Sequence, residues 1–412
     1  MEVVYKRCCG LDVHKDTVVA CVMIREGEKV EKDIRTFGAM TADLVVLSDW
    51  LGAHQVTHVA MESTGIYWKP VFNLLDTSFH LILVNAAHIK KVPGRKTDVK
   101  DCEWIADLLA HGLLKGSFIP PEPIRDLRDL VRYRKSLTDE RVRAVNRLQK
   151  ILESSNIKLS SVATDVMGVS GRAMLEALAT GSTDPEVLAN LARGRLRQKL
   201  AALRQALEGR FRPHHQFLLG QMLSHLDFMD EAIAEISQEV AKRIGPFEPQ
   251  VMVLKTIPGV DQKVAEAIVS EIGVDMSRFP DHRHLASWAG LCPGNNESAG
   301  KRRSGKTRKG NQWLRRMLIE TAWTVSRAKE SYLNALYHRL ARRRGIKKAA
   351  VGVSHAILVM AYHILKTGLP YHELGSDYFD RLNIVQVKRH ALRRLEALGY
   401  KVVLEQTQPT TS

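Results

Sequence analysis

The sequence predicts a mixed α/β domain at the N-terminus, a helical coiled-coil middle and a mostly helical C-terminal part, and three observations support this interpretation. Residues 1–117 alternate short β-branched apolar runs with segments of helical periodicity. Residues 118–247 lose the strand pattern and keep apolar residues at helical spacing. Residues 248–370 continue as helices and are followed by a basic tail at 371–412. At 412 residues the chain is long enough for two or three domains with separate cores.

The order of the elements expected in the N-terminal domain narrows its fold class. The patterns predict, in order, strands at 3–11, 17–24 and 33–37, a helix at 41–50, a strand at 56–61, a helix at 66–75, a strand at 80–84 and a helix at 98–111. The order β-β-β-α-β-α-β-α is that of an RNase H-like fold, in which parallel strands extend three antiparallel ones. The proline-rich segment Phe118–Pro123 is then expected as a linker.

The middle region contains two long apolar patterns. The second keeps a regular 3-4 spacing and consists of Leu219, Met222, Leu226, Met229, Ile233, Ile236 and Val240. The first is looser and consists of Leu127, Leu130, Leu137, Leu148 and Leu152. Heptad spacing favours a coiled coil, so a helical hairpin or a dimerisation stalk is expected, with the core of an ordinary helical domain as the alternative. Gly245 and Pro246 end the pattern.

A helix-hairpin-helix is expected at the start of the C-terminal region. The turn at residues 256–260 contains Pro258 and Gly259, and an apolar helical pattern follows from Ala265 to Gly273. Such a turn offers backbone amides to a phosphate at a helix N-terminus, so Gly259 is a predicted nucleic-acid contact. An ordinary helical hairpin is the alternative. One more basic helix is expected in the tail, at 384–398.

The charge of the chain gives the first indication of a partner. There are 61 Lys and Arg against 45 Asp and Glu, a formal net charge of +16. No acid lies between Glu297 and Glu320. That interval holds the predicted nucleic-acid contacts Lys301, Arg302, Arg303, Lys306, Arg308, Lys309, Arg315 and Arg316. A second basic run contains Arg339, Arg342, Arg343, Arg344, Lys347 and Lys348. Cations that neutralise phosphates release counterions, so a nucleic acid is the expected partner, with a solvated basic surface as the alternative.

Four carboxylates are expected at one edge of the predicted sheet. Asp12 and Glu62 end the first and fourth strands, and Asp98 and Asp101 share one face at the start of the last helix. Carboxylates gathered in this way repel one another unless cations neutralise them, and hard oxygen ligands favour Mg²⁺ or Mn²⁺. Two such ions stabilise the attacking and leaving oxygens at a phosphodiester. Each acid alone could be a surface carboxylate or a helix cap, so the metal site is predicted from the set of four.

Ser298 lies in a Gly- and Asn-rich segment beside a run of cations that could hold a scissile phosphate and stabilise the charge developing on it. A serine in a loop is usually only solvated, so the residue types favour that interpretation, with a nucleophile as the alternative. The next segment, Gly300–Thr307, matches the letters of a nucleotide-binding P-loop. A P-loop joins a buried strand to a helix, and neither is expected directly beside it, so a nucleotide site is not predicted.

Membrane and secretion signals are not expected in this chain. No stretch of about 18 apolar residues is evident, so a membrane span is not predicted. The first ten residues lack the apolar core and cleavage site of a signal peptide. The cysteines are scattered without metal-ligand spacing and are expected as reduced thiols at Cys8, Cys9, Cys21, Cys102 and Cys292. A cytoplasmic protein is therefore expected.

Several motifs in combination resemble the DEDD transposases of the insertion-sequence-110 family, which includes related DNA invertases. They occur in family order along nearly the whole chain, as Gly-Leu-Asp-Val-His-Lys from Gly10, Met-Glu-Ser-Thr-Gly from Met61, Lys-Thr-Asp-x-x-Asp from Lys96, Ile-Pro-Gly-Val from Ile257, Gly-Leu-x-Pro from Gly290, Ser-x-Gly from Ser298 and Gly-Asn-x-x-Leu-Arg from Gly310. The resemblance places the family's acidic tetrad on Asp12, Glu62, Asp98 and Asp101, and its nucleophilic serine on Ser298.

The resemblance also implies an architecture and a reaction. It implies a RuvC-like N-terminal domain, a coiled coil for dimerisation and a C-terminal transposase domain. The reaction it implies is DNA transposition or site-specific recombination through phosphoserine intermediates. A noncoding bridge RNA would pair with donor and target DNA, and the subunits would assemble as dimers or tetramers.

Other functions remain open from the sequence. A site-specific DNA invertase of the same family is the nearest alternative, and flanking DNA would separate it from a transposase. An RNase H-like junction nuclease that uses water is a second alternative, with Ser298 structural. A non-catalytic nucleic-acid-binding protein is disfavoured because all four acids are present. An actin-like ATPase is disfavoured because its adenosine-binding segments are not apparent.

Overall fold

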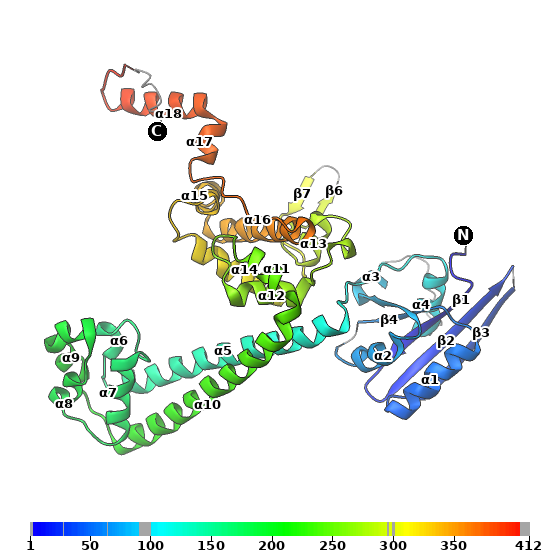
Figure 1. Cartoon of the computed structure of the whole chain (residues 1–412), viewed down its shortest axis with the longest axis horizontal. Coiled ribbons are helices and arrows are strands. Elements are labelled where there is room, and N and C mark those ends of the chain that lie inside the picture. The colour runs from blue at the N-terminus through cyan, green and yellow to red at the C-terminus, as the bar shows by residue number, and fades with distance from the viewer. Residues whose placement is uncertain are drawn as a thin grey trace. The chain divides into compact units, whose positions relative to one another are not determined.

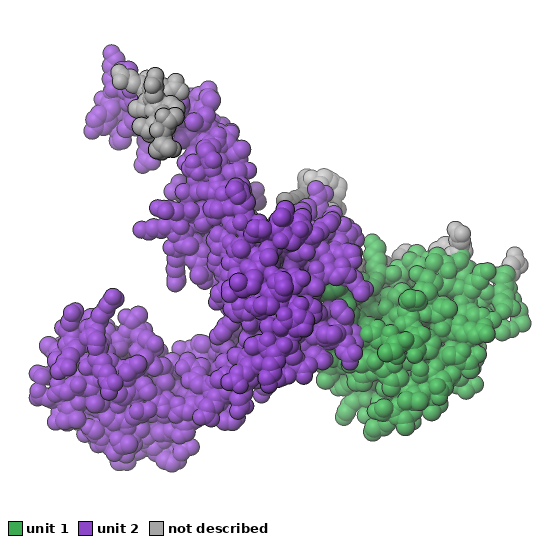
Figure 2. Space-filling view, in the orientation of Figure 1, with its two compact units in different colours: residues 1–119 green, residues 120–412 purple. Residues whose placement is uncertain are grey.

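A computed structural model describes residues 3–27, 29–63, 65–89, 100–294, 296–298 and 301–403. The chain forms two compact units, Met1–Ile119 and Pro120–Ser412 (Figure 1, Figure 2). The regions expected as separate middle and C-terminal domains therefore share one unit. The finer divisions at residues 247 and 370 stay predictions.

A five-stranded mixed sheet organises the first unit. Its elements are β1 (Arg7–Val13), β2 (Thr17–Glu26), β3 (Lys29–Gly38), α1 (Thr41–Ala53), β4 (His58–Glu62), α2 (Trp68–Leu75), β5 (His80–Val84), α3 (Ala86–Ile89) and α4 (Asp101–Ala110). The strand order is β3-β2-β1-β4-β5, in which β2 is antiparallel to β1 and β3, whereas β4 is parallel to β1 and β5. The predicted succession of strands along the chain, with three antiparallel strands extended by parallel ones, is confirmed, whereas the short helix α3 was not predicted. Strand β3 begins before residue 33 because polar residues there continue the ladder with β2.

The two faces of this sheet are covered by different helices. Leu11 belongs to the cluster that packs against α1 and α2, whereas Cys8 belongs to the cluster that packs against α4. Between these two strand residues, Gly10 lies where the backbone of β1 comes close to the backbone of α4. A Cβ on Gly10 would lie 2.2 Å from the carbonyl oxygen of Cys102 and 2.4 Å from the backbone nitrogen of Ala106. The missing side chain therefore lets α4 lie directly on β1.

We expect Gly10→Ala to destabilise the first unit, because the added methyl group meets backbone atoms of α4 that cannot rotate away. Overpacking of this kind costs about 1–3 kcal/mol and lowers the midpoint of thermal or urea unfolding. Gly52→Ala is the matched control, since Gly52 lies in α1 with nothing within 4 Å of its Cβ position. Alanine is favoured over glycine in a helix by roughly 0.5–1 kcal/mol. Equal midpoints for the two variants would contradict the close packing of α4 on β1.

The cysteines are free thiols. All five are unpaired, and the four in the first unit are buried. Burial raises the pKa of the Cys8 thiol to about 12, so this thiol stays protonated at neutral pH. Such a side chain packs as a small apolar group.

Helices build the second unit, with one short β-hairpin in its described part. Its longer elements are α5 (Glu122–Ser154), α7 (Val169–Ala179), α10 (Pro213–Ile244), α12 (Gln262–Ile272), α14 (Gln312–Val325), α15 (Tyr332–Arg344), α16 (Ile346–Thr367) and α18 (Ile384–Ala397). Its short elements are α6 (Leu159–Val162), α8 (Pro185–Asn190), η1 (Gly194–Lys199), α9 (Leu200–Leu207), η2 (Gly245–Phe247), α11 (Glu248–Leu254), η3 (Met276–Arg278), α13 (His282–Trp288), β6 (Asn296–Ser298), β7 (Lys301–Ser304) and α17 (Tyr378–Leu382).

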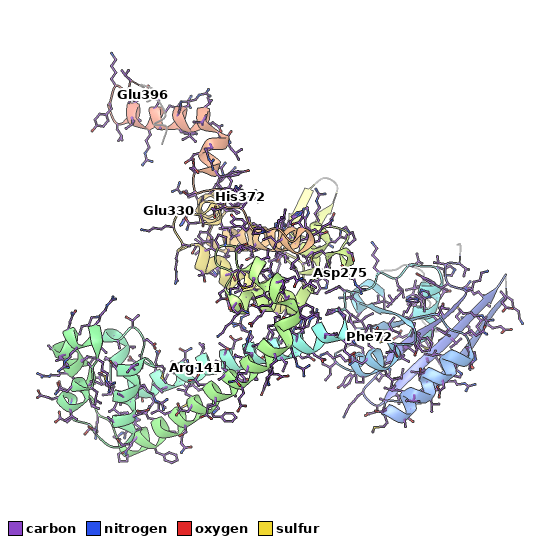
Figure 3. The ribbon with its side chains drawn as sticks, viewed as in Figure 1. Phe72, Arg141, Asp275, Glu330, His372 and Glu396 are labelled. Atoms are coloured by element: carbon purple, nitrogen blue, oxygen red, sulfur yellow. The ribbon has the colours of Figure 1, made fainter. Side chains whose placement is uncertain are left out.

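The predicted apolar patterns of the middle region pack against each other within one chain. Helices α5 and α10 run side by side as a long hairpin (Figure 1). Four of the seven heptad residues of α10 are buried, and the other three are half-buried. Ion pairs between the helices confirm that they are antiparallel: Arg243 Nη1 lies 3.2 Å from Asp126 Oδ2, and Arg141, labelled in Figure 3, pairs with Asp230. Dimerisation through this hairpin stays a prediction.

Among the described helices, α16 alone has the length and apolar composition of a possible membrane span, which was not singled out from the sequence. By length and composition alone, this helix could cross a membrane. Within the structure, 50% of its most apolar window is buried. Helix α16 packs against α11, α13, α14 and α15, so it is the central helix of the C-terminal bundle. Burial in such a core explains its apolar composition.

Candidate active site

Asp12 and Glu62 are neighbours at the carboxyl ends of two parallel strands. Leu11 of β1 pairs with Met61 of β4, so the next residues along the two strands are Asp12 and Glu62. Adjacent strands lie about 4.8 Å apart. Leu11 and Met61 face α1 and α2, and side chains alternate along a strand, so both acids belong to the opposite face. Asp12 exposes 27% of its side chain and Glu62 is also half-buried, so both carboxylates can meet solvent.

Helix α4 brings Asp101 to the same edge of the sheet. The helix runs antiparallel to β1: near its C-terminus the carbonyl oxygen of Ala110 accepts the N–H of Val4 at 2.8 Å, and near its N-terminus Cys102 lies against Gly10. Asp101 is the first residue of α4. It therefore lies toward the carboxyl end of β1, where the predicted acids of β1 and β4 are found.

Asp98, the remaining member of the predicted tetrad, lies outside the described residues. Among the residues that the structure describes, no group of three or more His, Cys, Asp or Glu side chains could hold a metal ion. The donors at this edge are the carboxylate oxygens of Asp12, Glu62 and Asp101, and hard oxygen donors of this kind fit Mg²⁺ or Mn²⁺. His14 lies beside them, with Nε2 3.2 Å from Asp12 Oδ2.

Ser298 lies on a β-hairpin, contrary to the loop expected from its Gly- and Asn-rich sequence. Strand β6 pairs antiparallel with β7, and Ser298 is opposite Lys301. The segment that matched a P-loop therefore contains strand β7, preceded by a strand that was not expected. Helix α14 begins only at Gln312. Residues 305–311 separate β7 from α14, so the helix does not directly follow the matched segment as it does in a P-loop. The absence of a nucleotide site stays a prediction.

Two glycines close the base of this hairpin. A Cβ on Gly310 would lie 2.3 Å from the backbone nitrogen of Gly290, so the two backbones touch. Beside them the N–H of Asn311 donates to the carbonyl oxygen of Trp288 at 3.1 Å. The segments beginning Gly-Leu-x-Pro and Gly-Asn-x-x-Leu-Arg thus meet, although the hairpin separates them in sequence. Their contact fixes where the Ser298 hairpin leaves the helical bundle.

A buried polar network fixes the helix that follows the hairpin. Asn311 caps α14, because its Oδ1 accepts the N–H of Leu314 at 3.0 Å. Its Nδ2 donates to Glu271 Oε2 at 2.5 Å. Glu271 is 2% exposed and accepts two hydrogen bonds from Arg132, at 2.7 and 2.8 Å. Arg128 donates to the main-chain oxygen of Glu271 at 2.6 Å. Glu271 therefore joins α5 to the N-terminus of α14.

Glu271 was not among the residues predicted from the sequence, although a signal exists. Every residue of α12 from Val264 to Ile272 is buried, yet this run contains two acids, Glu266 and Glu271. Acids are rarely buried unless they are paired. Helix α5 supplies the partners, since Arg134 Nη2 also lies 2.6 Å from Glu266 Oε2. Two acids within an apolar helix, together with an arginine-rich helix, could have indicated this network.

The predicted phosphate-binding cations differ in how far they are already paired. Lys301, Arg302 and Arg303 belong to β7, and their side chains lie outside the described part. Lys306, Arg308 and Lys309 are exposed between β7 and α14, and none forms an ion pair with another described residue. Arg315 donates to the hydroxyl of Thr307 at 2.8 Å, and Arg316 lies 2.8 Å from Asp139 and 3.2 Å from Glu320. The positive charges of Lys306, Arg308 and Lys309 are therefore available to bind an anionic ligand.

Helices α11 and α12 and the turn between them occupy the segment predicted as a helix-hairpin-helix. Gly259 has a φ of +85°, in the region that favours glycine, and a Cβ there would lie 2.4 Å from Val325 Cγ2. A cavity of about 590 Å³ lies between this turn, α5 and α14. The side chain of Asp261 already caps α12 by accepting the N–H of Val264 at 2.8 Å. This carboxylate competes with a phosphate for the helix N-terminus, so the contact at Gly259 stays a prediction.

Comparison with protein families gives two matches. A family model described as "Transposase" matches residues 9–157, a segment that includes Asp12, Glu62 and Asp101. A second, described as "Transposase IS116/IS110/IS902 family", matches residues 251–338 and includes Ser298 and Asn311. The acidic edge and the serine hairpin thus lie in separate matched segments.

Curated relatives are similar over part of their length. The protein y4qE of Sinorhizobium fredii, which bears the name of a transposase, is 29% identical over 248 residues, 59% of this chain and 52% of y4qE. The "Insertion element IS116 uncharacterized 44.8 kDa protein" of Streptomyces clavuligerus is 26% identical over 272 residues, 58% of this chain and 65% of that protein. The "Insertion element IS110 uncharacterized 43.6 kDa protein" of Streptomyces coelicolor is 26% identical over 304 residues, 68% of this chain and 73% of that protein. The chain spans about half the length of y4qE.

Proposed function

The chain belongs to the IS116/IS110/IS902 family of transposases, and from this membership we propose that it cleaves and exchanges DNA strands with a metal-bound acidic site and a serine nucleophile. The observation that supports this most strongly is the register of β1 with β4, in which Asp12 and Glu62 directly follow the paired residues Leu11 and Met61 at the carboxyl ends of the two strands. The strand order β3-β2-β1-β4-β5, three antiparallel strands extended by two parallel ones, supports an RNase H-like, RuvC-like interpretation of the first unit.

The acidic edge is the proposed metal site. Asp12, Glu62, Asp98 and Asp101 would hold Mg²⁺ or Mn²⁺ through carboxylate oxygens. When bound, the metal supplies charge neutralisation at a phosphodiester and at its leaving oxygen. The protein's contribution is rigidity: Asp12 and Glu62 are held by the strand ladder, and Asp101 by the packing of α4 on Gly10.

Ser298 is the proposed nucleophile. Its Oγ forms a bond to the phosphorus of a DNA phosphodiester, the bond from phosphorus to one deoxyribose oxygen breaks, and the serine proton ends on the released deoxyribose hydroxyl. A hydroxyl of another strand then attacks the phosphoserine, returns its proton to Oγ and completes the exchange. The number of phosphoester bonds is conserved, so no external energy source is needed.

Activation of Ser298 is proposed to come from the acidic edge. A serine hydroxyl is a weak nucleophile unless a base or a metal site draws off its proton. Glu297 is the only acid between Asp281 and Glu320, so the hairpin supplies cations but little base. We therefore propose that the two sites act together, within one chain or between subunits.

The proposed partners follow from the charge and the family. The net charge of +16 and the exposed cations Lys306, Arg308 and Lys309 support binding of DNA and of a noncoding bridge RNA. The α5–α10 hairpin is the proposed dimerisation element, with a tetramer as the larger assembly. A C-terminal transposase domain at 248–370, a helix-hairpin-helix within it and a cytoplasmic location complete the proposal, with a DNA invertase as the alternative.

We expect Asp12→Asn and Glu62→Gln each to lower strand exchange in Mg²⁺ by about 10²–10³-fold or more, the loss typical of removing a group that stabilises transition-state charge. Asn and Gln have nearly the same shape as the side chains they replace, and each substitution removes one charge from a cluster of like charges. Both variants should therefore fold. Asp16→Asn is the matched control, because Asp16 is exposed in the turn between β1 and β2. Calorimetric Mn²⁺ titration gives a second readout, in which both active-site variants should bind more weakly. Wild-type exchange in both variants would overturn the metal site.

A further inference from the structure

An arginine-lined groove lies between α15 and the C-terminal helices α17 and α18. Its volume is about 1060 Å³. Helix α15 contributes Arg339, Arg342 and Arg343, and α18 contributes Arg394. These three helices belong to the same unit, and α17 and α18 are the red helices that follow α15 and α16 in Figure 1. The groove lies almost wholly beyond residue 338, where the second family match ends.

The charge in this groove is unbalanced. Asp380 is the only acid that lines it, and none of its four arginines forms an ion pair with a described residue. Arginines in the last turn of α15 interact favourably with the helix dipole, which explains part of their placement. Arg394 has the same favourable placement, in the last turn of α18. The dipole does not explain Arg339, which lies before the last turn of α15, and like charges three or four residues apart on a helix repel one another. An anionic ligand would relieve this repulsion.

The wall opposite α15 is held in place by aromatic packing. Tyr332, at the start of α15, stacks on Phe379 with ring centroids 5.4 Å apart and contacts Tyr378 edge-on at 5.1 Å. Arg339 Cζ lies 4.9 Å from the centroid of the Phe379 ring. The N–H of Tyr332 also donates to Glu373 Oε1 at 2.8 Å. These contacts fix α17 against α15, so the groove is a built feature of the fold.

We propose that this groove binds the phosphodiester backbone of a nucleic acid. The inference rests on the proposed function and adds a contact surface separate from the acidic edge and the Ser298 hairpin. Guanidinium groups bind phosphates bidentately, and contacts of this kind fix the position of the nucleic acid without reading its sequence. DNA and RNA share this backbone, so the test includes both.

The experiment measures affinity across a salt series for Arg339→Gln/Arg342→Gln/Arg343→Gln in the full chain. The ligands are a labelled mixed-sequence duplex DNA and a single-stranded RNA of the same length. Each phosphate contact contributes a slope of about −0.9 for duplex DNA or −0.7 for single strands in log K against log salt. The triple variant should therefore flatten the slope by roughly 2–3 with at least one ligand, and the ligand affected identifies the source. Arg394→Gln should flatten the same slope by about 0.7–0.9, because it lies on the opposite wall.

The matched control is Arg193→Gln/Arg195→Gln/Arg197→Gln, which removes the same charge from exposed positions around η1. The control should keep the wild-type slope and, because its three arginines are exposed, the wild-type unfolding midpoint. The α15 triple variant also loses the contact of Arg339 with Phe379, so circular dichroism verifies that it is folded at the temperature of the binding measurement. Equal flattening by both triples would overturn the groove in favour of a diffuse charge effect. If the wild-type chain binds nucleic acid and the α15 triple variant has the same salt slope, the proposed role of the groove is wrong but the proposed function is not affected. A wild-type chain that binds neither ligand would overturn the proposed function as well.

Discussion

Ser298→Ala is expected to lose the covalent protein–DNA adduct and strand exchange together, while nucleic-acid binding persists. Removing Oγ deletes the atom that bonds to phosphorus, and loss of a nucleophile typically lowers a rate by about 10⁴–10⁶-fold. Affinity should change little, because the exposed cations Lys306, Arg308 and Lys309 remain. The measurement is a denaturing gel of end-labelled DNA incubated with the protein in Mg²⁺, followed by proteolysis and mass spectrometry to locate the modified residue.

Ser304→Ala is the matched control for this experiment. Ser304 lies on the other strand of the same hairpin, paired with Asn296, and its Oγ accepts the N–H of Lys306 at 3.1 Å. The control should keep adduct, exchange and binding, since this hydroxyl has a local structural partner. If Ser298→Ala still cleaves DNA at the wild-type rate, water is the nucleophile, and an RNase H-like junction nuclease becomes the better interpretation.

The fold of the first unit could largely be predicted from the sequence, because the residue patterns that mark its strands and helices are local. Alternating apolar runs mark the strands, and the acids Asp12 and Glu62 stand at the ends of two of them. Once the strand order is known, the parallel register alone places these two acids side by side. The limits of β3 were less predictable because its polar, exposed residues pair through backbone atoms, which composition does not reveal.

The surroundings of Ser298 were less predictable because they depend on distant contacts. The sequences of β6 (Asn-Glu-Ser) and β7 (Lys-Arg-Arg-Ser) contain no apolar residue and therefore no apolar alternation, so no strand was expected. The hairpin is set by the backbone contact of Gly290 with Gly310 at its base. The buried carboxylate of Glu271 accepts hydrogen bonds from Arg132, 139 residues away in the sequence, and from Asn311, 40 residues away. Periodicity in a window of one helix carries no information on such pairs.

Glu271→Ala is expected to give a large loss of stability in the second unit, about 3–5 kcal/mol, which is typical of breaking a buried ion pair. Burial lowers the pKa of Arg128 to about 10, and the carboxylate of Glu271 is the group that most opposes this shift. Without Glu271, the guanidinium groups of Arg128 and Arg132 stay desolvated at neutral pH and lose that compensation. Urea unfolding followed by circular dichroism measures the loss. Glu231→Ala, on the exposed face of α10, should stay within about 0.5 kcal/mol of wild type.

The same network should couple stability to the reaction, because Glu271 also holds Asn311, the cap of α14 beside the base of the Ser298 hairpin. At a temperature where Glu271→Ala is still folded, we expect slower adduct formation with unchanged nucleic-acid affinity, since the hairpin is less firmly placed while its exposed cations remain. Glu271→Gln keeps an acceptor for Asn311 and should recover part of the rate. A double-mutant cycle with Arg132→Ala should show a coupling of roughly 0.5–3 kcal/mol in stability. Additive losses in that cycle would contradict a shared network between α5 and α14.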